Sequence, residues 1–405
     1  MRFELPIIPD AHFRKDARQA DRLRSVDQII DENITRHVAA WAIPGDLFDG
    51  ITDPQTRLDW YTRVRRMSDH APVIICTGNH DQPGELTPMT FIASKFPVFV
   101  ADTPTTVVVR RWGIFDATRV DYELHVFVFP YPHRAGLVAD SVAPGDLAQA
   151  ARPLLDAIFM EHGAKLDAAR AKGHATMMIG HANVAGSIMG NGQPLIGQEV
   201  ELDTQLLARL GHIPKVLYHI HKAQDVGDAV LTGSVTAMSW GETDEKRYVR
   251  VVFESTPTNA WDWRIESVPL TTPKLHLVEM SLTGDVRTLV SGPVSVGDTD
   301  HVRVRVRFKD VDRGFYGLHR NEIARIYGNS ARLDIEPICE VETGLRSEAV
   351  ASAKTLHDKV AAWADSAGLA LPEDLSSALS ALETQPHERV VTEFTARLLG
   401  LVDGI

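Results

Sequence analysis

The sequence predicts an α/β protein in which two packed sheets are covered by helices. Three observations predict this fold class: short apolar runs alternate with amphipathic helical stretches, the first runs end in polar residues, and further strand-like runs follow in the middle of the chain. Strands that alternate with helices of this length require crossover connections and a largely parallel sheet. Such sheets bind ligands outside the carboxyl ends of their strands.

The first third of the chain shows this alternation. Apolar runs at 5–9, 38–44 and 73–76 are typical of strands, and apolar residues recur at helical spacing over 21–35 and again from Pro54 onward. The middle of the chain supplies a second sheet. Its predicted strands are 105–110, 124–129, 176–179, 215–218, 229–231 and 248–253, with helical stretches at about 145–171 and 200–210.

A cluster of prolines between 255 and 273 indicates a domain boundary. We therefore expect a main domain over 1–272, a small α+β capping domain over 273–345 and a C-terminal helical segment over 346–405. In that segment Leu356, Val360, Trp363 and Ala367 share one helix face, which is most simply packed against its own domain.

The composition excludes several classes of protein. The 405 residues include 42 Lys and Arg against 54 Asp and Glu, so the net charge of −12 rules out a uniformly basic coat for nucleic acid. Two distant cysteines, Cys76 and Cys339, form neither a disulfide framework nor a thiolate metal site, and suit a reducing cytoplasm. There is no apolar run of about 20 residues for a membrane span, and charged residues within the first sixteen leave no signal-peptide core. We expect a cytoplasmic or nucleoid-associated protein without membrane contact.

Five short motifs carry the candidate chemistry, and each follows a predicted strand. They are Asp10-x-His12, Gly45-Asp46-x-x-Asp49, Gly78-Asn79-His80-Asp81, Gly180-His181 and His219-x-His221. Carboxylate, amide and imidazole ligands without thiolate suit Mn²⁺, Fe²⁺ or Zn²⁺. A carboxylate shared by two ions about 3.5–4 Å apart allows both ends of a displacement at phosphorus to be held.

Taken singly, most of these motifs have an ordinary explanation. Asp-x-His and Gly-Asp-x-x-Asp are common in turns and caps, and a lone histidine such as His181 is usually a partly buried imidazole with its hydrogen bonds made. Their order along the chain and their repeated placement after strands favour one shared site. The other twelve histidines match no motif, although His133 lies close enough in sequence to a strand end to be of interest.

These motifs resemble the signature of the calcineurin-like metallophosphoesterase superfamily, and within it the SbcD nuclease family. Three longer stretches, 180–187, 218–224 and 233–242, carry the likeness to that family. The resemblance implies a four-layer α-β-β-α metallophosphoesterase sandwich over 1–272, a capping domain that guides DNA and a C-terminal segment that binds an ATPase. Two departures are Tyr218, where the family has glycine, and Phe13, where a glycine often follows the first motif.

Carried over to this sequence, the resemblance implies seven ligands for two divalent ions. One ion is held by Asp10, His12, Asp46 and His221, and the other by Asp46, Asn79, His181 and His219. His80 is expected to protonate the leaving 3′ oxygen, Asp49 to lie beside the catalytic site, and Asp81 to orient neighbouring groups. Mn²⁺ is the expected metal, with Mg²⁺, Fe²⁺ and Zn²⁺ as alternatives.

The same resemblance implies the activity and the partners. It indicates a 3′–5′ exonuclease on double-stranded DNA and an endonuclease on single strands, in DNA repair, recombination and replication. The implied partners are DNA, an SbcC-type coiled-coil ATPase and a second copy of the chain in a homodimer.

Two local patches could meet the phosphates of DNA. Arg303, Arg305 and Arg307 alternate with valines, so the three guanidinium groups share one strand face, in a region (301–332) with a net charge of +5. Arg14 and Lys15 beside the first motif form the second patch. The alternative for either patch is an ordinary solvated face.

Three hypotheses therefore stand. The first is a two-metal DNA phosphodiesterase, the second a metallophosphoesterase for small phosphodiesters or nucleotides, and the third a non-catalytic scaffold that bridges DNA. A lost ligand would mark the scaffold, and none of the seven is lost. The module after residue 273, which a small-molecule enzyme does not evidently need, favours the first.

Overall fold

The computed structural model describes every residue except 51, 83, 116–117, 140–145, 190–199, 241, 243, 258–259, 341–347, 386–389 and 391–405. Two compact units make up the chain. One comprises residues 1–281, 287–306 and 317–337, and the other comprises 282–286, 307–316 and 338–405. In the described part of the chain, none of the helices combines the length and apolar character needed to cross a bilayer.

The first sheet is built from both ends of the region 1–270. Its strand order is β14-β13-β1-β2-β3-β4, and β1 to β4 run parallel while β13 lies antiparallel to β1 and β14. The strands are β1 (Arg2–Ile7), β2 (Trp41–Ile43), β3 (Val73–Cys76), β4 (Val98–Ala101), β13 (Arg247–Ser255) and β14 (Trp261–Pro269). The crossovers are α1 (Gln19–Asn33), α2 (Pro54–Ser68) and a short 3-10 helix, η1 (Thr87–Phe91).

The second sheet is built from the middle of the chain. Its order is β11-β12-β10-β7-β6-β5, with β6, β7, β10 and β12 parallel and the two outer strands antiparallel to their neighbours. The strands are β5 (Thr105–Phe115), β6 (Thr118–Phe129), β7 (Ala175–His181), β10 (Lys215–Tyr218), β11 (Gln224–Val226) and β12 (Ala229–Leu231). Between them lie α3 (Arg134–Leu137), α4 (Leu147–Ala171), the pair β8 (Asn183–Val184) and β9 (Glu201–Leu202), and α5 (Thr204–Ala208).

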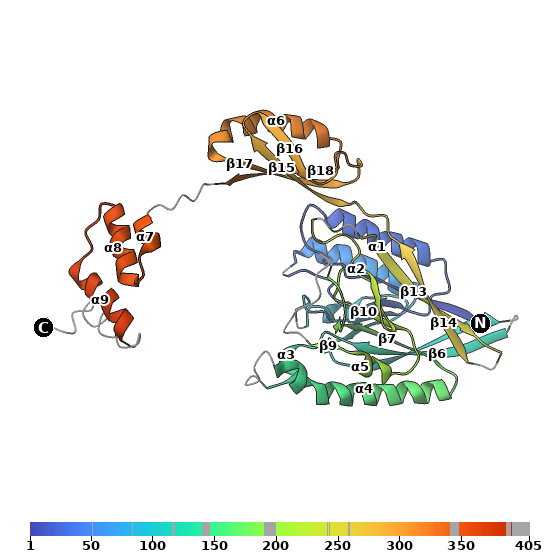
Figure 1. Ribbon diagram of the computed structural model, residues 1–405. Helices are drawn as coiled ribbons and strands as arrows, with labels where there is room; N and C mark the ends of the chain where they lie inside the picture. The colour runs from blue at the N-terminus through green and yellow to red at the C-terminus, as the bar shows by residue number, and fades with distance from the viewer. Residues whose placement is uncertain are drawn as a thin grey trace. The chain divides into compact units, whose positions relative to one another are not determined.

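Three apolar cores show the layering. Alternate residues of β3 belong to two of these cores. Val73 and Ile75 pack with α1 and α2, whereas Ile74 and Cys76 face the second sheet. On the far side of the second sheet, Phe127 packs against Phe159 of α4. Figure 1 shows α1 and α2 together on one side of this region and α4 on the other. The four-layer α-β-β-α fold class predicted from the sequence is confirmed.

Local capping explains where several helices begin. Helix α2 starts at Pro54, as predicted, because the Asp53 carboxylate accepts hydrogen bonds from the N–H groups of Gln55 and Thr56. The helix expected over 200–210 is shorter than predicted. Asp203 caps α5 by accepting from the Leu206 N–H at 2.8 Å, so residues 201–202 are free to form β9 instead.

A four-stranded sheet and one helix follow residue 274. The strand order is β16-β15-β17-β18, and Figure 1 shows α6 lying across the sheet. The elements are β15 (Leu275–Thr283), β16 (Val286–Ser291), β17 (His301–Lys309), a 3-10 turn η3 (Asp310–Asp312), α6 (Arg313–Tyr327) and β18 (Arg332–Glu340). On β17 the alternating valines are buried, as their spacing predicts.

The C-terminal region contains α7 (Glu348–Ser352), α8 (Leu356–Ser366) and α9 (Glu373–Thr384). Helix α8 begins where the Thr355 hydroxyl accepts from the Asp358 N–H at 3.0 Å. Trp363 on α8 is 56% exposed and Leu356 is 49% exposed. The predicted role of this face in binding an ATPase stays a prediction, as do the three domain boundaries.

Candidate metal centre

The structure brings the seven predicted ligands together at one rim of the sandwich. Three motifs follow the parallel strands β1, β2 and β3 of the first sheet, and two lie at or after the ends of β7 and β10 in the second. The carboxyl ends of both sheets meet here, which is why residues far apart in sequence become neighbours. The seven are Asp10, His12, Asp46, Asn79, His181, His219 and His221.

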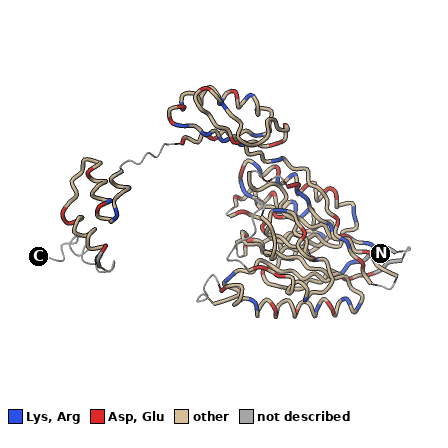
Figure 2. Tube along the Cα trace, viewed as in Figure 1, with Lys and Arg blue, Asp and Glu red and all other residues tan. Residues whose placement is uncertain are grey.

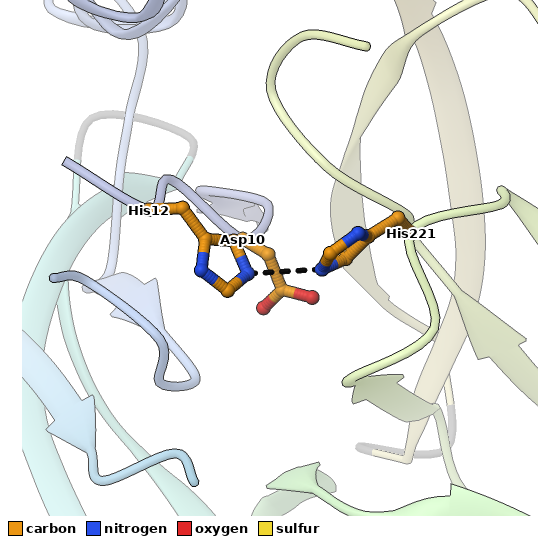
Figure 3. Close-up of side chains that lie close together, drawn as sticks. All are labelled: Asp10, His12 and His221. Atoms are coloured by element: carbon orange, nitrogen blue, oxygen red, sulfur yellow. Dashed lines mark hydrogen bonds between the residues drawn. The ribbon is translucent and has the colours of Figure 1, made fainter. Parts of the chain in front are cut away.

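Asp46 lies between two groups of ligands. Its Oδ2 is 3.5 Å from Nε2 of His12 and 3.3 Å from Nε2 of His181. On one side, Nε2 of His12 faces Nε2 of His221 at 2.9 Å, beside the carboxylate of Asp10 (Figure 3). One oxygen of Asp46 therefore faces both groups, as the bridging role predicted for it requires.

The second group surrounds His181. Its Nε2 lies 3.0 Å from Oδ1 of Asn79 and 3.2 Å from Nδ1 of His219, which is itself 2.9 Å from the same Asn79 oxygen. The other ring nitrogen of His181 donates to the Pro44 carbonyl at 3.0 Å, because a carbonyl can only accept. Nδ1 therefore carries the proton, and the lone pair on Nε2 points into the cluster.

This arrangement fits divalent cations. The lone pair of His181, the amide oxygen of Asn79 and the carboxylate of Asp46 are all acceptors, and acceptors packed at these distances need a positive charge between them. Oδ1 of Asp10 is buried and accepts no hydrogen bond from the described residues. Side chains in groups of three lie within 4.8 Å of one another: Asp10 with His12 and His221, and Asp46 with His181 and His219.

Burial sets the protonation of these groups. It lowers the pKa of His12 well below the usual range and that of His221 to about 4, so both imidazoles are in the neutral form that binds metal. Burial, with the charge of Asp46 adding to it, raises the pKa of Asp10.

The backbone is strained at three of the ligands. Among the described residues, the only non-glycine residues with positive φ are His12 (45°), Asp46 (47°) and His219 (103°). Such conformations persist where surrounding contacts impose them, and they concentrate at functional sites. Two glycines make room for the ligands: a Cβ on Gly45 would lie 2.7 Å from Nδ1 of His181, and one on Gly78 would lie 2.1 Å from Oδ1 of Asp46.

His80 lies at the edge of the cluster. Its backbone N–H donates to Asp46 at 2.9 Å, and its ring is close enough to His12 and Asp46 to form a further group of possible ligands. Nδ1 of His80 is 3.2 Å from Oδ1 of Asp49, whose other oxygen accepts from Arg14. The side chain is 41% exposed, so Asp49 holds the ring in place while one edge stays open to a substrate.

Two further residues support the rim. The carboxylate of Asp81, which the sequence predicts to orient its neighbours, accepts from the N–H groups of Leu47, Phe48 and Gly78. Burial, followed by the charge of Asp46, raises the pKa of Asp81 to about 7.

Sequence reasoning missed Tyr131, whose ring centroid lies 5.4 Å from that of His219 and 6.0 Å from that of His181. Its position just after the strand 124–129 was the available signal. His133 is exposed, and its ring lies 5.0 Å from that of Tyr131.

The Tyr218 side chain, where the resembled family has glycine, is fully buried between the sheets. Tyr218 is not among the described residues with positive φ, whereas its neighbour His219 is.

The predicted DNA-contacting arginines make ion pairs within the protein. Nε of Arg303 lies 3.0 Å from Glu336, and Nε of Arg305 lies 3.1 Å from the same carboxylate, while Arg305 also approaches Glu279 at 3.5 Å. Figure 2 shows basic and acidic residues interleaved in this sheet.

Arg307 lies further along β17 and is exposed, as is Lys15 near the first motif. Arg14 pairs with Asp16 and Asp49. The predicted contacts of these residues with DNA stay predictions.

No protein-family model matches the chain. Among solved structures, it is similar to GAP50, the anchor in the inner membrane complex of Plasmodium, with 13% identity over 68% of this chain and 90% of that one and a TM-score of 0.39. A dimetal phosphatase from Danio rerio matches with 9% identity over 66% of this chain and 99% of that one (TM-score 0.36). Vps29 of Chaetomium thermophilum matches with 12% identity over 67% and 100% (TM-score 0.25). Because these identities and TM-scores are low, only the side chains of the site indicate the function.

Proposed function

We propose that this chain is a two-metal phosphodiesterase of the calcineurin-like type, and that its substrate is DNA. The observation that carries the proposal is the position of Asp46, one oxygen of which faces a ligand histidine on either side, His12 at 3.5 Å and His181 at 3.3 Å. Divalent cations held here would supply Lewis acidity toward phosphoryl oxygens and would lower the pKa of a water molecule. Their ligands would be the seven side chains of the candidate centre, whose nitrogen and oxygen atoms suit Mn²⁺, Fe²⁺ or Zn²⁺.

His80 and Asp49 complete the reaction. Oδ1 of the Asp49 carboxylate, which is fixed in turn by Arg14, lies 3.2 Å from Nδ1 of His80. This contact orients the imidazole. His80 then delivers a proton to the departing sugar oxygen, which would otherwise leave as an unstable alkoxide.

Support for DNA as the substrate comes from the sequence. The stretches 180–187, 218–224 and 233–242 resemble the SbcD nuclease family, whose members act with an SbcC-type ATPase and pair as homodimers. Exonuclease action on duplex ends, endonuclease action on single strands and both protein partners belong to the proposal on this ground. On β17, Arg307 is exposed and is proposed to make the main contact with the phosphates, whereas Arg303 and Arg305 are proposed to contribute weakly because carboxylates already face them.

One observation favours a second candidate, hydrolysis of small phosphodiesters or nucleotides. The guanidinium groups of Arg303 and Arg305 already face Glu279, Asp334 and Glu336, so this strand carries little unmatched positive charge. A small substrate would need no such charge, because the metal centre alone would hold its phosphate.

The experiment compares three substrates under one set of conditions. The purified chain is incubated with bis(4-nitrophenyl) phosphate, with labelled duplex DNA and with labelled single-stranded DNA, in Mn²⁺, in Mg²⁺ and in chelator. The Asp46→Asn variant serves as the matched control, because it keeps the shape of the side chain and removes the bridging charge.

The first proposal expects metal-dependent cleavage of both DNA substrates, lost in chelator and in Asp46→Asn. Hydrolysis of the small diester without DNA cleavage, with and without the ATPase, would favour the second candidate. Absence of all metal-dependent cleavage would leave the scaffold hypothesis.

A further inference from the structure

A second group of metal-ligating side chains lies away from the predicted centre. Glu123 and His125 are two residues apart on β6, so both point to the same face of the second sheet. His174 immediately precedes β7, which pairs with β6 in the register Leu124 to Ala175. The backbone N–H of His174 donates to the Ala169 carbonyl at 3.1 Å, which fixes the start of the strand. All three candidate ligand side chains are therefore attached to backbone that is fixed by strand pairing or by a hydrogen bond.

The donor atoms converge on one point. Oε2 of Glu123 is hydrogen-bonded to Nε2 of His125 at 3.1 Å and lies 3.6 Å from Nε2 of His174, and one ligand atom from each of the three residues lies within 4.8 Å of the other two. Ligands at about 2.0–2.1 Å from a tetrahedral ion lie roughly 3.4 Å apart, which matches these separations. At 3.6 Å the His174 contact is too long for a hydrogen bond.

The surroundings prepare the three side chains for a cation. Oε1 of Glu123 accepts from Nε of Arg110 at 2.7 Å, so the carboxylate is fixed and its other oxygen is turned to the imidazoles. The rings of His125 and His174 are stacked, with centroids 5.3 Å apart. All three side chains are partly exposed, at 26%, 17% and 27%, so an ion can enter from solvent.

We propose that Glu123, His125 and His174 form a separate binding site for one divalent transition-metal ion, preferentially Zn²⁺. Two imidazoles and one carboxylate are a ligand set that Zn²⁺ accepts, with the fourth position left to solvent. The site lies at the amino end of β7, whereas the predicted centre lies at its carboxyl end. The two sites share no ligand, so the new site does not depend on the proposed phosphodiesterase activity.

The test counts bound zinc in matched variants. Wild-type chain and the double variant His125→Gln/His174→Gln are loaded with Zn²⁺ and gel-filtered, and zinc per chain is measured by atomic emission. We expect the double variant to hold one zinc fewer, with metal-dependent hydrolysis within about twofold of wild type. His276→Gln is the control. Nε2 of His276 also faces a carboxylate, Asp300 at 2.9 Å, but among the described residues this pair belongs to no group of three possible metal ligands. This control should lose no zinc.

A second measurement isolates the site from the predicted centre. In an Asp46→Asn/His221→Gln background, Co²⁺ is titrated while visible absorption and melting temperature are followed. We expect one Co²⁺ per chain with a raised melting temperature, both abolished by adding Glu123→Gln. Equal zinc content in wild type and the double variant, or no Co²⁺ bound by the folded background variant, would overturn the proposal.

Discussion

Strand β7 has a histidine at each end, and the two ends differ in what surrounds them. His181 at the carboxyl end is fully buried and faces ligands from both sheets. His174 at the amino end is 27% exposed and faces two residues of β6, its neighbour in the same sheet. The difference shows how the number of candidate ligands follows topology: two sheets that meet at one rim bring together seven candidate ligands, whereas one sheet brings together three.

The largest expected effect separates the two ends of the strand directly. His181→Ala should lower metal-dependent hydrolysis by about 10³-fold or more, because it removes a ligand and leaves Asp46 and Asn79 facing a gap. His174→Gln, immediately before the same strand, should leave the rate within about twofold. Steady-state rates on a diester substrate check both. Equal losses in the two variants would contradict the separation of the sites.

His80→Ala should lower the rate by about 10²- to 10⁴-fold while leaving the metal content of the centre unchanged. The physical reason is that His80 is assigned proton transfer and not ligation, with its ring held through Nδ1 by Asp49. Metal analysis and rates on the same preparation separate the two roles. Partial rescue by added imidazole would support proton transfer, and loss of bound metal would reassign His80 as a ligand.

Gly78→Ala tests how closely the backbone at residue 78 must approach the carboxylate of Asp46. The new Cβ would lie 2.1 Å from Oδ1 of Asp46, so we expect Asp46 to move and metal affinity to fall by at least about tenfold. Gly317→Ala on α6 is the control, because nothing lies within 4 Å of its Cβ position, and it should stabilise the fold by about 0.5–1 kcal/mol. Metal titration and thermal unfolding distinguish the two outcomes.

Asp16→Asn tests the ion pairs that Asp16 makes with Arg22 and Arg14. Asp16 accepts from the fully buried Arg22 at 2.7 and 2.9 Å, and also binds Arg14, so its loss should reduce the free energy of unfolding by about 3 kcal/mol. Its partial burial alone would raise the pKa of Asp16, but Arg22 and Arg14 hold it well below the ordinary value.

A carboxylate with a lowered pKa stabilises the fold above its unfolded pKa of about 3.9, and this contribution is lost as the pH falls further. Urea unfolding at pH 7 and pH 3 should therefore show a smaller difference between wild type and Asp16→Asn at pH 3. An equal difference at both pH values would contradict the assignment.

The smallest effect is expected on the four-stranded sheet that contains β17. Arg303→Gln/Arg305→Gln should weaken duplex binding by less than about threefold in low salt, because both side chains are already paired with carboxylates. Binding isotherms at several salt concentrations check this. A reduced salt slope of one or more units would mean that these pairs open and that the arginines contact phosphates.

Much of the fold followed from local sequence. A continuous apolar run located β3, alternating valines located the buried face of β17, and Asp53 with Pro54 placed the start of α2. The local sequence predicted secondary structure less well where the pairing of two separate segments decides it. The short β9, paired with β8, replaced part of a predicted helix because strand pairing with a distant partner is invisible in a single stretch of sequence.

The sequence by itself determined which residue types stand at the strand ends, and hence the seven candidate ligands and His80. Only the tertiary structure decided that Asp46 lies between two histidines, that Tyr131 packs beside the cluster, and that Glu123, His125 and His174 meet. It also decided that Arg303 and Arg305 have carboxylate partners. The reason is physical: residue type and spacing fix which face of an element a side chain occupies, whereas distances between atoms depend on how separate elements pack.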